Sequence, residues 1–153
     1  MRVIITILLL CFGYSTLAQQ SFSYTPYFSA VIVKDIDASV KWYSDVFELR
    51  TRDVINDPNE AYKITILESD KLLLELLQLK QSIPKDKALE GQPKGTRLQG
   101  HFKIGFRVDD MDASVKRLSS MGIDVSRLVN EQKTGKRNLL VTDPDGNLIQ
   151  FFE

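Results

Sequence analysis

Hydrophobic and polar residues follow two periodicities along the chain, and both occur in each half. In the first half, short apolar runs rich in β-branched and aromatic residues predict four strands, at residues 27–33, 50–55, 62–68 and 72–79. A helix is predicted after Asp35, a favourable N-cap residue, because apolar residues then recur at helical spacing: Ile36, Val40, Tyr43 and Phe47. The predicted order is strand, helix and three further strands.

The second half repeats this order. Apolar runs predict four strands there, at residues 102–108, 125–130, 138–142 and 148–152. Asp110 caps a predicted helix that ends at Gly122 and buries Met111, Val115 and Leu118. Residues 81–100 are rich in charge, proline and glycine and show no sustained period. We therefore predict two modules, at residues 27–80 and 101–153, joined by a linker at 81–100.

A nine-residue stretch occurs twice and relates the two halves. Val33–Lys41 returns 75 residues later as Val108–Lys116, and seven of the nine positions are identical. Asp35 and Asp110 hold the same place in the two copies. The repeat indicates an internal duplication, so we predict a single domain made of two βαβββ modules.

The first residues have the pattern of a secretory signal. A positive start at Arg2 precedes an apolar run from Val3 to Phe12, and small residues around Ala18 suit a signal peptidase. The apolar run is shorter than the roughly 20 residues that a membrane-spanning helix needs. We predict cleavage after residue 18, an extended lead-in at 19–26, and export to the periplasm or the outside of the cell.

Composition narrows the class of partner. The chain carries 20 Lys and Arg against 20 Asp and Glu, so its net charge is near zero, and no basic run is present. This balance argues against nucleic acid as a partner. The single cysteine, Cys11, lies in the predicted signal, so the mature protein must rely on packing rather than disulfides. After signal cleavage we also expect no membrane association.

Two features resemble the vicinal oxygen chelate superfamily across residues 27–153. One is the repeated entry V-x-D-x-D-A-S-V, and the other is the closing stretch DPDGNLIQFFE, which begins at Asp143 and fits a type I turn. The resemblance implies an α+β fold in which two tandem modules form a curved mixed sheet around a cleft. The superfamily includes glyoxalase I, extradiol dioxygenases, and fosfomycin and bleomycin resistance proteins, so its fold does not specify one activity.

Metal-using members of that superfamily take ligands from the first and last strands of each module. The corresponding positions here are Phe28, Glu75, Lys103 and Gln150; the match of Glu75 with Gln150 is the less direct one, because the copies align there only with gaps. Only Glu75 is a strong ligand, since phenyl and ammonium groups offer no lone pair and a neutral amide binds weakly. We therefore expect no cofactor. The alternative is a divalent metal held by Glu75, His101 and Gln150.

Alternation along the strands predicts a small-molecule site with one apolar and one basic wall. Its predicted ligand-binding residues come from the first and last strands of the modules: Phe28, Ile32, Glu75, Lys103, Arg107, Gln150 and Phe152.

Lys103 admits two interpretations. In the first, it forms a buried ion pair with Glu75 that replaces the lost metal charge, and Gln150 satisfies the remaining hydrogen bonds. In the second, Lys103 and Arg107 bind an anionic or enolate-like oxygen while Glu75 acts as a catalytic general base.

The leading functional hypothesis is an exported protein that binds a small molecule without the usual metal. The alternative is a metal-dependent, glyoxalase-like lyase or isomerase, so the sequence leaves enzyme activity open. A third hypothesis is that the domain has a structural or partner-binding role without catalysis. Pairing into a homodimer is also compatible with the resemblance.

Overall fold

The computed structural model describes residues 25–132 and 135–153, which form two modules and a linker. The first module holds β1 (Ser29–Ile32), α1 (Ile36–Phe47), β2 (Arg50–Asn56), β3 (Tyr62–Glu68) and β4 (Leu73–Leu79). The linker carries one short helix, α2 (Lys85–Ala88). The second module holds β5 (Lys103–Arg107), α3 (Met111–Ser120), β6 (Leu128–Asn130), β7 (Arg137–Thr142) and β8 (Leu148–Phe152). The predicted β-α-β-β-β order is confirmed in both modules.

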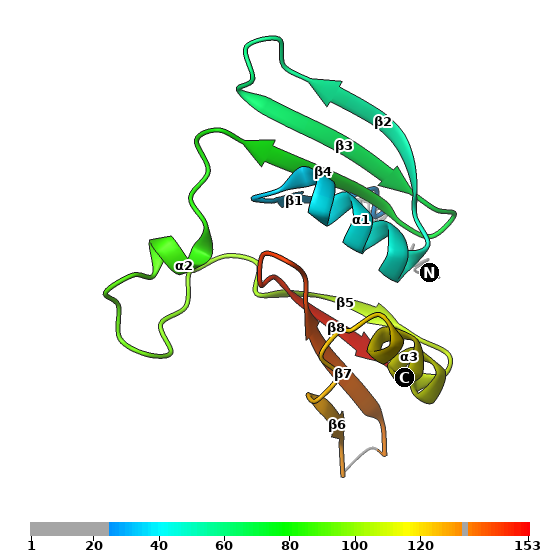
Figure 1. Ribbon diagram of the computed structural model, residues 1–153. Helices are drawn as coiled ribbons and strands as arrows, with labels where there is room; N and C mark the ends of the chain where they lie inside the picture. Colours follow the sequence, from blue (N-terminus) through cyan, green and yellow to red (C-terminus); the bar gives the residue numbers. More distant parts are fainter. Residues whose placement is uncertain (1–24, 133–134) are drawn as a thin grey trace, which may run out of the picture.

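Each module forms one mixed sheet of four strands. The orders are β1-β4-β3-β2 and β5-β8-β7-β6, with β1 parallel to β4, β5 parallel to β8, and all other pairs antiparallel. Figure 1 shows the strands from β2 at the top to β6 at the bottom, with the edge strands β1 and β5 between the two halves. The fold is therefore α+β with two tandem modules, as predicted, and the described strands close no barrel.

Several predicted boundaries differ from the structure. The strand expected at 125–130 is limited to Leu128–Asn130, because Asp124 accepts a hydrogen bond from the backbone N–H of Ser126 at 2.9 Å and folds the preceding residues into a turn. The linker, expected to be irregular, contains the helical turn α2. The predicted signal peptide lies outside the described residues. Among the residues that are described, no helix has the length and apolarity needed to cross a bilayer.

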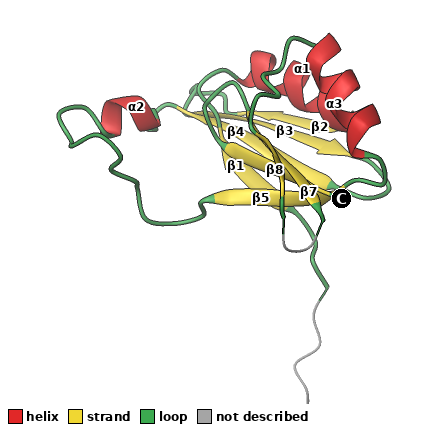
Figure 2. Ribbon diagram, turned by 90° about the horizontal axis from the view of Figure 1, so that it is seen from below, coloured by secondary structure: helices red, strands yellow, loops and turns green. Residues whose placement is uncertain are grey.

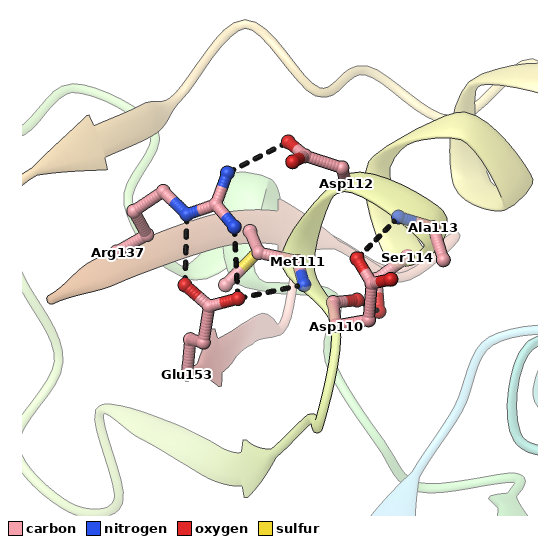
Figure 3. A network of polar contacts seen from close by, with 7 residues as sticks. All are labelled: Asp110, Met111, Asp112, Ala113, Ser114, Arg137 and Glu153. Carbon is pink, nitrogen blue, oxygen red and sulfur yellow. Dashed lines mark hydrogen bonds and ion pairs between the residues drawn. The ribbon is translucent and has the colours of Figure 1, made fainter.

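The internal repeat extends to the way in which each helix begins. Asp35 and Asp110 are N-caps that accept hydrogen bonds from the third residue after them, at 3.0 and 2.9 Å. The first N–H of α1 is bound by Gln78 Oε1 at 2.8 Å, and the first N–H of α3 by Glu153 Oε1 at 3.1 Å. Figure 3 shows Arg137 bridging Glu153, at 2.8 Å, and an acidic residue in the first turn of α3. The end of the last strand thus anchors the helix of its own module.

Both long helices lie on the same side of the sheets, as Figure 2 shows, and one hydrophobic core runs beneath them. In α1 and α3, Ile36, Tyr43, Met111 and Leu118 are buried as predicted. Phe47, at the end of α1, contacts second-module aromatic residues, so the core is continuous between the modules. The docking of the modules is therefore supported by apolar packing.

The turn between β7 and β8 supplies one set of polar contacts between the modules. The buried carboxylate of Asp143 accepts hydrogen bonds from the backbone of Asp145 and from both the backbone and the side chain of Asn147. It also accepts one from the hydroxyl of Tyr43 in α1, at 2.8 Å. Burial, and then the adjacent negative charge of Asp143, raise the pKa of the Tyr43 phenol above its ordinary value. This hydrogen bond joins residues of both modules.

Candidate functional site

In the described part of the chain, no helix covers the faces of the two sheets that point away from α1 and α3, and we call them the open faces. Buried Leu74, Leu76, Ile149 and Phe151 point to the helix side, so strand alternation places the residues between them on the open faces. Alternation assigns the predicted site residues of the strands to this side: Ile32 in β1, Glu75 in β4, Lys103 and Arg107 in β5, and Gln150 and Phe152 in β8. Arg107 is the last residue of β5 and also lines a cavity that reaches the helix side. Phe28 directly precedes β1.

The register of the strands resolves the uncertain half of the sequence alignment. Glu75 is paired with Ala30 across the parallel strands β1 and β4, and Gln150 is paired with Gly105 across β5 and β8. The offset between the modules is 75 residues for both members of this pairing. Glu75 and Gln150 therefore occupy equivalent positions, as the repeat led us to expect.

Apolar residues lie around Glu75 on the open face of the first module, which also carries Glu68, a carboxylate paired with Arg50 and Arg52. Phe28 and Ile32 remain 56% and 54% exposed, although both are large hydrophobic residues. Glu75 is half-buried and lies opposite Ile66 of β3. Within residues 25–132 and 135–153, its side chain makes no hydrogen bond or ion pair. Glu75 is thus a carboxylate with unused acceptor capacity on a hydrophobic surface.

The open face of the second module carries a chain of polar contacts. The Lys103 ammonium donates a hydrogen bond to Gln150 Oε1, and Gln150 Nε2 donates to Asn138 Oδ1 at 2.8 Å. Gln150 is only 8% exposed, so both ends of its amide are satisfied inside the protein. Asn138 was not predicted as a site residue. The hairpin of β7 and β8 was the available signal, because it places alternate residues of both strands on one face.

The structure corrects the ion-pair interpretation of Lys103. No ion pair joins Lys103 to Glu75 among the described residues, and Lys103 contacts the neutral amide of Gln150 instead. Lys103 and Arg107 lie at the two ends of β5, about 13 Å apart along the strand. Arg107 lines a separate cavity on the helix side, so these two cations do not share one binding point.

The residues at the four superfamily ligand positions do not suit a metal. Phe28 has no donor atom, Lys103 is a cation, and the oxygen of Gln150 is already engaged by Lys103. That same engagement weakens the alternative set of Glu75, His101 and Gln150. The described part of the chain holds no group of three His, Cys, Asp or Glu residues placed to bind a metal ion. Glu75 alone remains as a strong ligand.

Two cavities lie at the ends of the module junction. The smaller, of about 360 Å³, is formed by the end of α1, the β3–β4 turn, the end of β5 and α3. The larger, of about 810 Å³, lies between the linker, the end of β1 and the β7–β8 turn, and it includes Ile32. Neither cavity is lined by Phe28, Glu75, Lys103 or Gln150.

Comparison with known proteins identifies the relatives of this architecture. Residues 26–151 match the Glyoxalase/Bleomycin resistance protein/Dioxygenase superfamily. A lactoylglutathione lyase of Haemophilus influenzae is 32% identical over 124 residues, which cover 79% of this chain and 86% of that protein. Among solved structures, a glyoxalase family protein from Enterococcus faecalis aligns with a TM-score of 0.71 at 19% identity, covering 84% of this chain and 97% of that one. A fosfomycin resistance protein from Listeria monocytogenes aligns with a TM-score of 0.62 at 12% identity, covering 86% and 93%.

Proposed function

Because the chain belongs to the glyoxalase, bleomycin resistance protein and dioxygenase superfamily, we propose that it binds a small molecule on its open faces without the usual metal. One observation carries this proposal. Glu75 is a half-buried carboxylate without a partner among the described residues, and it stands on an exposed apolar surface. A protein surface of this kind favours a ligand that has an apolar body and a few polar groups.

The unused carboxylate also constrains the ligand. Glu75 keeps part of its hydration while the face is open, and any molecule that covers the face would remove that water. Removing water from an unpaired charge is costly unless a hydrogen-bond donor replaces it. We therefore infer that the ligand presents an N–H or O–H group, or a positive charge, to Glu75.

Lys103 would supply the second polar contact. Its ammonium can donate three hydrogen bonds, and one goes to Gln150. The side chain is exposed, so the remaining donors are accessible to an oxygen atom of a ligand. The proposed ligand is a small, partly apolar molecule with a donor for Glu75 and an oxygen acceptor for Lys103.

A catalytic variant of this site is the second candidate function. The similarity to a lactoylglutathione lyase favours a lyase or isomerase in which Glu75 serves as the general base. In its metal-dependent form this activity needs ligands that Phe28 and Lys103 do not provide. Turnover of a 2-oxoaldehyde–thiol adduct by the purified protein, with and without added divalent metal, tests it.

The biological setting completes the proposal. We expect removal of residues 1–18, export to the periplasm or beyond, and no nucleic-acid or membrane partner, on the sequence grounds given above. A homodimer is compatible with the apolar open face of the first module, because burial of exposed Phe28 and Ile32 would favour association.

The test is a small-molecule fragment screen by ligand-observed NMR, repeated on Glu75→Gln and Lys103→Met. We expect fragments that bind the wild type to lose binding in both variants while the unfolding temperature stays within a few degrees. Matched controls are Glu90→Gln and Lys41→Met, which change exposed residues away from the open faces. The proposed site is refuted if every fragment that binds the wild type also binds both site variants with unchanged affinity. Stoichiometric, tightly held Zn, Ni, Mn or Fe in the purified protein would refute the metal-free form.

A further inference from the structure

The smaller cavity lies on the helix side of the sheets and is walled by both modules. The first module contributes the end of α1 and the β3–β4 turn, and the second contributes the end of β5, part of α3 and β8. Its volume of about 360 Å³ is within the range of small-molecule pockets. It is distinct from the proposed Glu75 site, because neither Glu75 nor Lys103 lines it, although Arg107 at the end of β5 does.

The inner surface of this cavity is aromatic. The ring of Phe47 lies 4.7 Å from that of Phe106 and 5.9 Å from that of Phe151, measured between ring centres. Phe106 and Phe151 are 6.2 Å apart, so the three rings contact one another. These rings come from α1, β5 and β8, and they offer a flat apolar body a surface on which to pack.

One positive charge at the rim is already used by the protein. Arg117 of α3 donates a hydrogen bond to the carbonyl oxygen of Asp45 at 2.6 Å and lies 3.3 Å from the carboxylate of Glu48. Both partners belong to the C-terminal end of α1, where a positive charge is stabilised by the unpaired carbonyl groups of the helix. Arg117 therefore links the two modules, and its charge is balanced by Glu48.

Two further cations at the rim have no such partner. Lys71, in the β3–β4 turn, and Arg107, at the end of β5, line the cavity. In the described part of the chain, neither side chain makes a hydrogen bond or an ion pair. Asp70 also lines the cavity and is likewise unpaired, so the uncommitted charge at the rim is two positive and one negative. This excess of positive charge favours the binding of an anion at the rim.

We propose that this cavity is a second binding site, which accepts a small molecule with an aromatic or similarly flat apolar body and one anionic group. The body packs on Phe47, Phe106 and Phe151, and the anion is bound by Lys71 from one module and Arg107 from the other. Carboxylate, sulfonate and phosphate groups share the required charge and acceptor geometry. Because the two cations belong to different modules, occupation of the site also links the modules.

The experiment titrates the probe 1-naphthoate into the ¹⁵N-labelled protein that begins at residue 19. We expect chemical-shift changes to concentrate at the residues that border the cavity, 69–72, 106–108, 114, 117 and 118. Loss of one charge-assisted contact in Lys71→Gln or in Arg107→Gln is expected to weaken binding roughly tenfold. The neutral analogue 1-naphthalenemethanol is expected to bind weaker than 1-naphthoate by a similar factor.

Lys41→Gln is the matched control, because Lys41 is an exposed lysine that pairs with Asp45 on α1 and does not line the cavity. It is expected to leave the affinity for 1-naphthoate unchanged. The proposal is overturned if 1-naphthoate does not bind at millimolar concentration, or if the shifts concentrate in β4 and β8 residues of the open faces. Equal binding to the wild type, Lys71→Gln and Arg107→Gln would overturn it as well. Failure here leaves the Glu75 site intact, since that site is tested by different variants.

Discussion

Replacement of Tyr43 by phenylalanine tests whether the β7–β8 turn fixes the docking of the two modules. The Tyr43 hydroxyl donates a hydrogen bond of 2.8 Å to the buried carboxylate of Asp143, 100 residues away in the chain. The variant keeps the ring, which is 4% exposed, and removes only the hydroxyl. Any loss of stability therefore reports on this contact between the modules rather than on apolar packing.

The expected cost follows from the hydrogen bonds of Asp143. A hydrogen bond to a charged group contributes about 1.5–3 kcal/mol to the free energy of unfolding. Asp143 retains three other donors, two from Asn147 and one from Asp145, so its charge stays solvated by the protein. We therefore expect the lower part of that range, about 1.5–2 kcal/mol, which corresponds to a fall in Tm of roughly 5 °C.

Urea denaturation followed by circular dichroism measures this change. Tyr62→Phe is the matched control, because Tyr62 is 37% exposed and its hydroxyl makes no hydrogen bond with a described residue; its effect should stay within about 0.5 kcal/mol. A loss below about 0.5 kcal/mol for Tyr43→Phe would show that this hydrogen bond does not contribute to the docking of the modules.

The same contact gives an alkaline dependence. Burial and the charge of Asp143 raise the pKa of Tyr43 in the folded protein. In the unfolded chain the Tyr43 phenol has its ordinary pKa of about 10. Above that pH the unfolded state binds fewer protons than the folded state, so the stability due to Tyr43 is present below about pH 10 and declines as pH rises further. The decline should be shallower in Tyr43→Phe, and identical slopes would contradict this account.

Three further predictions concern the last strand and the core. Hydrogen bonds from Arg137 and from the first N–H of α3 lower the pKa of Glu153. The stability that Glu153 provides is therefore present above the ordinary carboxyl pKa of about 4.3 and is lost as the pH falls further. Between pH 7 and pH 3, the urea midpoint should fall less in Glu153→Gln than in the wild type. Leu76→Ala, at a fully buried position, should cost about 2–5 kcal/mol in calorimetry or urea unfolding, and a cost below 1 would contradict the assigned core. In Gly105→Ala the new Cβ would lie 3.1 Å from the ring of Phe152, which is 41% exposed and can move. We therefore expect the free energy of unfolding to fall by less than about 1 kcal/mol and the NMR signal of Phe152 to shift. An unshifted Phe152 signal would contradict the contact.

The elements of the fold were predictable because they depend on near neighbours in the chain. The caps at Asp35 and Asp110 are set by a side chain and an N–H three residues apart, and both form as predicted. Strand alternation likewise assigned Glu75 and Gln150 to the open faces. The repeat of 75 residues then fixed their equivalence, which the strand register confirms.

The sequence by itself therefore determined the two modules, their order of elements and the faces on which the candidate residues lie. Only the tertiary structure decided which side chains meet. Lys103 contacts Gln150 rather than Glu75, and Arg107 borders a cavity on the helix side. Those outcomes depend on how the modules dock through Tyr43 and Asp143, and on side-chain reach across strands. Periodicity cannot give such distances, because it reports the face of each residue and not the separation of residues far apart in the chain.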